Sequence, residues 1–204
     1  MGRSSTARER LLDAAGELMQ HRAYGSLGVA EICTRADVRK GSFYHFFESK
    51  QALTLATIDA HWQAEGALWD AALDVEAPAL TRLGRLLATL IAEQHRAHRR
   101  TGVVHGCLYA NLALELSTQD RLVQTRLEEI FNEQIALVQA VLEDAGAEHA
   151  VPPESADRAT ARAVLAQYEG IVMFAKLAND PAVLDDIWEQ TMRIIGAKIP
   201  LTLG

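Results

Sequence analysis

Basic and aromatic side chains gather in one short stretch near the start of this chain, EICTRADVRKGSFYHFFESKQAL at residues 31–53. Guanidinium and ammonium groups can hydrogen-bond guanine edges in a DNA major groove, and hydroxyl groups reach phosphates or bases. A glycine among them removes a side chain where a backbone must approach a partner closely. A lysine at the start of the next helix adds its charge where the helix dipole already favours a phosphate. The residues that could contact DNA are Arg39, Lys40, Gly41, Ser42, Tyr44, His45 and Lys50.

Short helices must position these side chains. A capping box, Thr6-Ala7-Arg8-Glu9, predicts a first helix over 6–21. We expect a short helix over 29–35, a break at 36–38, and another short helix from Arg39 to about His45. Two short helices joined by a tight turn and braced by a third form a helix-turn-helix. The side chains expected to point inward are Val29, Ile32, Cys33, Val38, Phe43 and Phe46.

Charge is uneven along the 204 residues, which carry a formal net charge of −7. Residues up to Leu55 sum to +2 and the remainder to −9. A mildly basic head on an acidic body suggests that only the head meets a polyanion. The alternative is a solvated basic face over an ordinary helical hairpin, and composition alone leaves the two about even.

The rest of the chain also has helical periodicity, and its prolines separate the periodic segments instead of interrupting them. The segment Ser117-Thr118-Gln119-Asp120 and Asp180 are expected to cap helices, and Gly146 to end one. We therefore predict an all-α fold of about nine helices: an N-terminal three-helix helix-turn-helix domain and a C-terminal helical ligand-binding and dimerisation domain. The later helices are expected at 50–69, 79–100, a short segment after 106, 120–146, 155–178 and 182–198.

The ordered motif RLLDAAGELM…Y…VAEI…ADVRKGSFYHFFESKQAL resembles the DNA-binding domain of the TetR family of bacterial transcriptional regulators over about residues 8–55. The resemblance implies a DNA-binding domain at 1–50 and an effector-binding and dimerisation domain at 51–204. It also implies that the residues of 39–45 named above lie on a recognition helix, and that Lys50 clamps a phosphate.

The chain departs from the family pattern at a few positions. Leu27-Gly28 stands where a Thr-Ser pair often opens the second helix, and Ser26 is a possible substitute cap. Asp37 replaces the usual turn glycine, and Asp tolerates a left-handed backbone. These departures affect the expected operator sequence more than the motif.

The resemblance further implies a homodimer, paired through the last two long helices, because two recognition helices must lie one DNA turn, ~34–36 Å, apart. The alternative is that the apolar stripes of these helices are only intrachain core. The expected interface residues are Val164, Ile171, Ala175, Leu184, Trp188, Thr191 and Ile195.

The middle helices are expected, again by resemblance, to enclose a pocket for a hydrophobic or aromatic small-molecule effector. For any single aromatic among them, plain core packing is the stronger alternative. The residues expected to line the pocket are Trp62, Trp69, Leu90, Cys107, Tyr109, Leu112, Phe131, Tyr168 and Phe174.

Cys107 follows Gly106 near a helix start, where the dipole lowers the pKa of a thiol. A reactive thiol there could sense electrophiles or oxidants, and Lys176 could stabilise its thiolate. The alternatives are that Cys107 is a small buried hydrophobe and that Lys176 only ends a helix. Cys33 is expected to serve packing alone.

Other functions find little support in the sequence. His95 and His98 share a helix face, yet three metal ligands are not forced together, so neither a metal nor another cofactor is expected. Phosphate-binding, zinc-protease and nucleotide motifs are absent, so we do not expect an enzyme. Without a membrane-spanning apolar run or a disulfide framework, a cytoplasmic location is expected. The predicted function is a repressor released from a palindromic operator by a small-molecule or thiol-reactive effector. The alternative is a DNA-bound architectural or division-control protein that acts through protein partners.

Overall fold

A computed structural model describes residues 6–197, and this part of the chain contains nine α-helices, three short 3₁₀-helices and no strand. The all-α prediction is confirmed. The contacts divide the chain into two compact units. The first comprises the residues up to Glu65 together with Cys107–Glu129, and the second comprises Gly66–Gly106 together with the residues from Ile130 on.

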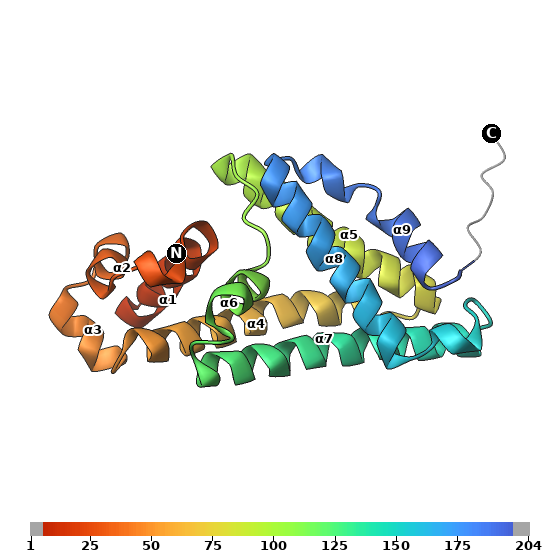
Figure 1. Ribbon diagram of the computed structural model, residues 1–204, viewed down its shortest axis with the longest axis horizontal. Helices are drawn as coiled ribbons and strands as arrows, with labels where there is room; N and C mark the ends of the chain where they lie inside the picture. The colour runs from red at the N-terminus through yellow and green to blue at the C-terminus, as the bar shows by residue number, and fades with distance from the viewer. Residues whose placement is uncertain (1–5, 198–204) are drawn as a thin grey trace. The chain divides into compact units, whose positions relative to one another are not determined.

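The first unit begins with the three helices of the predicted helix-turn-helix (red to orange in Figure 1). The capping box of Thr6 and Glu9 is confirmed: Glu9 N donates to Thr6 Oγ1 at 3.2 Å, and Thr6 N donates to Glu9 Oε2 at 2.7 Å. Its elements are α1 (Ala7–His21), η1 (Tyr24–Ser26), α2 (Val29–Arg35), α3 (Lys40–Phe46), the first part of α4 (Lys50–Leu73), α6 (Leu108–Leu116) and the start of α7 (Arg121–Ala147).

The core of the helix-turn-helix contains Leu11, Ile32 and Phe43, each with no exposed surface. One predicted inward residue is wrong: Phe46 is 36% exposed, and Phe47 is buried in its place. The helix explains the difference, because α3 ends at Phe46 and Phe47 has an extended backbone with φ −139° and ψ 123°. Helical spacing alone therefore does not decide which of these two neighbouring phenylalanines is buried at the end of the helix.

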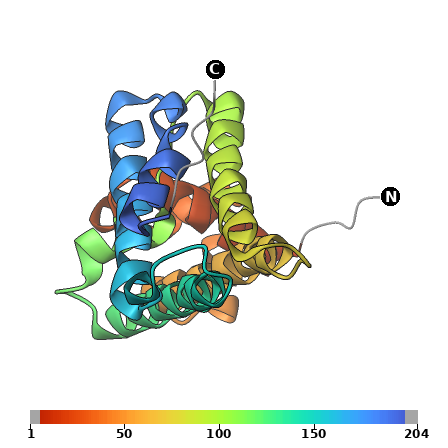
Figure 2. The same ribbon diagram turned by 90° about the vertical axis from the view of Figure 1, so that its right-hand side faces the viewer.

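The second unit is built from long helices that lie side by side. Figures 1 and 2 show α8 and α9 (blue) next to α5 (yellow-green). Gly102 and Asn179 end α5 and α8 in the left-handed conformation, with φ of 75° and 52°. Besides the later parts of α4 and α7, its elements are α5 (Ala79–Thr101), η2 (Pro153–Ser155), α8 (Arg158–Ala178), η3 (Pro181–Leu184) and α9 (Ile187–Ile194).

The final helix, predicted to be continuous over 182–198, is interrupted. Asp180 does cap its start by accepting from Ala182 N at 2.9 Å. The first turn then closes as a 3₁₀-helix, because Asp185 N donates to Ala182 O, three residues back, at 3.1 Å. The α-helical part begins only at Ile187, and residue 198 lies outside the described residues.

Between residues 6 and 197, no helix is both long enough and apolar enough to cross a membrane.

Candidate nucleic-acid interface

The face of α3 carries the side chains that the sequence assigns to base reading. Arg39 is the N-cap residue of α3, and the side chains of Lys40, Tyr44 and His45 are exposed on the helix, as is that of Ser42. A Cβ added at Gly41 would meet no atom within 4 Å. The fold itself therefore does not require a glycine there, and the position is open to an approaching partner.

The turn between α2 and α3 has the left-handed residue that the sequence predicts. Asp37 has φ 51°. The guanidinium of Arg10 in α1 donates to Ala36 O at 3.1 Å and to Asp37 O at 3.3 Å. The first helix thus holds the turn, and with it the start of α3, through backbone carbonyl groups. Arg10 was not among the residues singled out in the sequence.

Lys50 begins α4 and joins it to η1. Its ammonium donates to Tyr24 O and to Leu27 O, both at 2.9 Å, and lies 3.8 Å from the centroid of the Tyr24 ring. Two of its three N–H donors are therefore used inside the protein, and burial lowers the pKa of the Lys50 ammonium.

The same turn is held from its other side by α6. Tyr24 N donates to the carboxylate of Glu115 at 2.7 Å. Between α6 and α7, Asp120 Oδ2 accepts from Gln51 Nε2 of α4 at 2.7 Å. Asp120 is also the residue of the predicted capping segment 117–120 that caps α7, through Leu122 N. No local sequence signal marks Glu115, because it lies 91 residues from its partner.

The substitute cap expected for α2 does not form. Ser26 Oγ donates back to Ala23 O at 2.8 Å, and Gly28, the N-cap residue of α2, makes no side-chain capping bond. The reason is local, because Ser26 closes η1 and its hydroxyl is used within that turn. The α2 N–H groups at this end lack a protein side-chain cap, and such groups can bind a phosphate.

Several residues expected to line a pocket lie together in the first unit instead. The ring of Tyr109, which is fully buried, lies edge-on to those of His61 and Trp62, with centroids 5.4 and 6.2 Å apart. Burial, followed by the charge and hydrogen bond of Glu65, raises the pKa of Tyr109 well above its usual range. Leu112 is buried on the same helix, α6.

Cys107 is the N-cap residue of α6, which confirms its predicted place at a helix start. Its Sγ accepts from Ala110 N at 3.5 Å, and the residue is half-buried. Cys33 is buried in the helix-turn-helix core, as expected. Lys176 lies in the last turn of α8.

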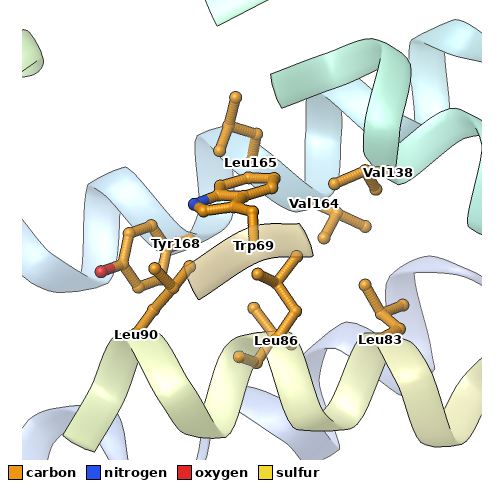
Figure 3. A pocket seen from close by; sticks show the side chains of 9 residues that line it. Trp69, Leu83, Leu86, Leu90, Val138, Val164, Leu165 and Tyr168 are labelled. Carbon is orange, nitrogen blue, oxygen red and sulfur yellow. The ribbon is translucent and has the colours of Figure 1, made fainter. Parts of the chain in front are cut away.

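A small apolar cavity of about 10 Å³ lies within the second unit (Figure 3). Three residues expected to line a pocket do line it: Trp69, Leu90 and Tyr168. Phe131 is half-buried on α7, and Phe174 is 56% exposed on α8, so neither lines this cavity. The cavity is lined by Trp69, Leu83, Leu86, Leu87, Leu90, Val138, Val164, Leu165 and Tyr168.

The residues expected at a dimer interface are mostly core of their own chain, which is the alternative stated above. Ile171 and Trp188 are half-buried, and the Trp188 ring packs 3.5 Å from the position of a Cβ on Gly84. The buried residues of the set are Val164, Ala175, Leu184, Thr191 and Ile195. The opposite side of α8, about 180° around the helix from the buried stripe, presents Met173, Phe174 and Leu177 to the outside instead.

One of the two histidines weighed as metal ligands has another partner. His95 Nε2 lies 3.1 Å from Asp185 Oδ1, and the nearby His105, which is not one of those two, has its Nε2 3.0 Å from Thr101 Oγ1. Within residues 6–197, no group of three His, Cys, Asp or Glu side chains could hold a metal ion.

An exposed, basic and aromatic α3 on a braced helix-turn-helix defines a DNA-binding protein. Residues 11–57 match the family model described as "Bacterial regulatory proteins, tetR family", and residues 79–191 match "Tetracyclin repressor-like, C-terminal domain". The chain therefore belongs to the TetR family, whose members are transcriptional regulators and not enzymes.

Solved structures and curated relatives agree with this assignment. The regulatory protein TetR from Rhodobacter sphaeroides is 30% identical with a TM-score of 0.84, over 93% of this chain and 99% of that one. Escherichia coli NemR, solved in a reduced form, is 25% identical with a TM-score of 0.78, over 94% and 99%. The transcriptional repressor DhaR of Mycobacterium sp. strain GP1 is 25% identical over 87% of this chain and 86% of its own length.

Proposed function

We propose that this DNA-binding regulator is a homodimeric repressor that binds a palindromic operator and leaves it when an effector binds. The observation that carries the proposal is the exposed face of α3, in a helix-turn-helix whose η1 turn is held by Lys50 and Glu115. In this proposal residues 1–50 bind DNA, and residues 51–204 bind the effector and dimerise in the cytoplasm. Repression is supported by the related repressors NemR and DhaR.

Dimerisation is proposed through the outward face of α8. A single short recognition helix reads too few bases for specificity in a genome, so a two-fold partner is needed. Small residues occupy the first half of this face, at Ala163 and Ala166, and larger apolar ones the second half, at Phe174 and Leu177. Exposed apolar area of this kind is unusual on a monomer and supports burial against a second copy.

Two features support an effector. The cavity around Trp69 and Tyr168 is apolar and suits a hydrophobic ligand, although its volume of about 10 Å³ requires side chains to move apart on binding. Cys107 supports a thiol-reactive alternative, since it is a half-buried residue at a helix N-terminus. That a relative, NemR, was solved in a reduced form fits this alternative.

Helix α6 can link a thiol event to the DNA-binding head. Cys107 caps its first turn and Glu115 lies in its last turn, where it holds Tyr24 N. Modification of the thiol would remove the cap and displace α6, which would release η1. An effector needs to prefer the DNA-incompetent shape by only about 1–3 kcal/mol to change operator affinity 5- to 150-fold.

The test is selection from a random duplex pool by the purified protein at near-physiological salt, beside a Tyr44→Ala, Lys50→Ala double variant. Recovery of one palindromic motif that the variant loses supports the repressor. Retention of DNA without sequence preference would instead favour the alternative, an architectural or division-control protein that acts through partners. The genomic positions of the recovered sites separate the two functions further. Sites beside a few genes favour the repressor, and sites scattered over the genome favour the architectural or division-control protein.

A further inference from the structure

Gln134 is a buried polar side chain whose amide oxygen has no hydrogen-bond donor among the described residues. It lies on α7 in the second unit and is only 2% exposed. Its Oε1 is fully buried and accepts no hydrogen bond from the residues described. Buried amide groups nearly always have a partner, because an unmet acceptor retains the full cost of leaving water. A polar partner is therefore expected to enter from outside the chain.

Gln134 is one helical turn away from a residue that lines the apolar cavity. It precedes Val138, which lines the cavity, by four residues on the same helix. Residues four apart on an α-helix lie on one face, with Cβ atoms about 6 Å apart. Both side chains are buried, so the face that they share is turned toward the core.

The lining of the cavity limits what can bind there. Every residue that lines it is apolar or aromatic, and no charged side chain is among them. A charged ligand would lose its hydration without a counter-charge, which excludes ionised groups. A neutral molecule with one hydrogen-bond donor could place its apolar body against Trp69 and Tyr168 and its donor on Gln134.

We propose that Gln134 is the polar contact for the effector, and that the effector is a small, neutral, mostly apolar molecule bearing one O–H or N–H donor. This rests on the proposed effector site in the second unit. Sites built around a hydrogen bond reject analogues that lack the group, since the buried protein acceptor is then left unpaired. Gln134 would therefore set specificity for a hydroxylated or amino ligand over its hydrocarbon analogue.

The test compares two probes of the same shape, 4-methylphenol and p-xylene, which differ by one hydroxyl in place of a methyl group. Their dissociation constants are measured by calorimetry without DNA, for the wild type and for Gln134→Met, an unbranched apolar replacement. Gln139→Met is the matched control, because Gln139 lies on the same helix and bonds Glu143 at 2.8 Å instead. Melting curves establish that each variant is folded.

The expected result is that the ratio of the p-xylene to the 4-methylphenol dissociation constant falls about tenfold in Gln134→Met and stays unchanged in Gln139→Met. An equal ratio in the wild type and Gln134→Met overturns the proposal. If that equality comes with a lower melting temperature of Gln134→Met, the amide is satisfied by a buried water. Failure of both probes to bind the wild type also overturns it. Since no DNA is present, none of these outcomes depends on whether the operator proposal holds.

Discussion

The carboxylate of Glu115 accepts a hydrogen bond from the backbone N–H of Tyr24 at 2.7 Å, across 91 residues of sequence. Tyr24 opens η1, the turn that leads into α2. The carbonyl groups of the same turn accept from Lys50. The turn between α1 and α2 is thus held by a carboxylate at its N–H end and by an ammonium at its carbonyl end.

Replacing Glu115 with alanine should destabilise the protein and weaken DNA binding together. A hydrogen bond to a charged group contributes ~1.5–3 kcal/mol, and its loss leaves a partly buried N–H without an acceptor. Thermal unfolding and fluorescence anisotropy on the selected duplex measure the two effects. Glu115→Gln retains an acceptor of the same length and should lose less of both. Equal loss in the two variants would mean that charge, and not the hydrogen bond to Tyr24, is what matters.

Arg39 is expected to contact the edge of one base in the major groove of the operator. Its side chain is exposed at the N-cap of α3 and makes no capping bond, so Arg39→Ala should leave the fold intact. We expect a cost of ~1–3 kcal/mol on the preferred site and relaxed preference at one position. Repeating the selection with the variant checks both. Arg35→Ala is the control, because Arg35 is an exposed arginine of the preceding helix that pairs with Glu17 at 2.6 Å.

Substitution of Lys50 is expected to change both the melting temperature and the salt dependence of DNA binding, because Lys50 combines a structural and an electrostatic role. Lys50→Met keeps the aliphatic stem but removes the two hydrogen bonds to η1, so the melting temperature should fall. If its third N–H also contacts a phosphate, affinity should drop similarly for all sequences, and the slope of log K against log salt should decrease by ~0.9. A lower melting temperature with an unchanged slope would leave Lys50 as a structural contact only.

Local patterns predicted the helices and their caps well, because each depends on a few neighbouring residues. The capping box at Thr6, the cap at Asp120 and the left-handed Asp37 are of this kind. The interrupted last helix was missed since Asp180 and Pro181 open a 3₁₀-helix as readily as an α-helix. Phe46 was predicted to be buried, whereas Phe47 is the buried residue, because helical spacing does not locate a helix end to one residue.

The candidate DNA-binding site could be predicted only where its residues are contiguous in the sequence. The candidate DNA-contacting residues of α3 are contiguous in the sequence, and the structure shows them exposed, as helical spacing predicted. Arg10 and Glu115 hold the turns on either side of α2 from distant parts of the chain, and a single sequence contains no signal for such pairs. The apolar stripes of α8 and α9 were assigned to a partner copy because periodicity identifies a buried face without saying what buries it.

The outward face of α8 should govern dimerisation. Phe174 is 56% and Leu177 81% exposed, and a charge at either position would be desolvated in a dimer. The double variant Phe174→Glu, Leu177→Glu should therefore sediment as a monomer at concentrations where the wild type is a dimer. The control is Leu114→Glu, because Leu114 on α6 is 86% exposed and lies outside this face. A dimeric double variant would assign the interface to another surface.

Cys107 should carry any response to thiol-reactive compounds. Cys107→Ser retains a side chain that can accept from Ala110 N, so α6 should keep its cap and the variant its DNA affinity. N-ethylmaleimide should release the wild type from the operator and leave Cys107→Ser bound, as followed by anisotropy. Cys33→Ser is the matched control. Cys33 is buried in the helix-turn-helix core, so this variant should respond to N-ethylmaleimide as the wild type does. Release of Cys107→Ser by the reagent would exclude Cys107 as the sensor and leave the apolar cavity as the effector site.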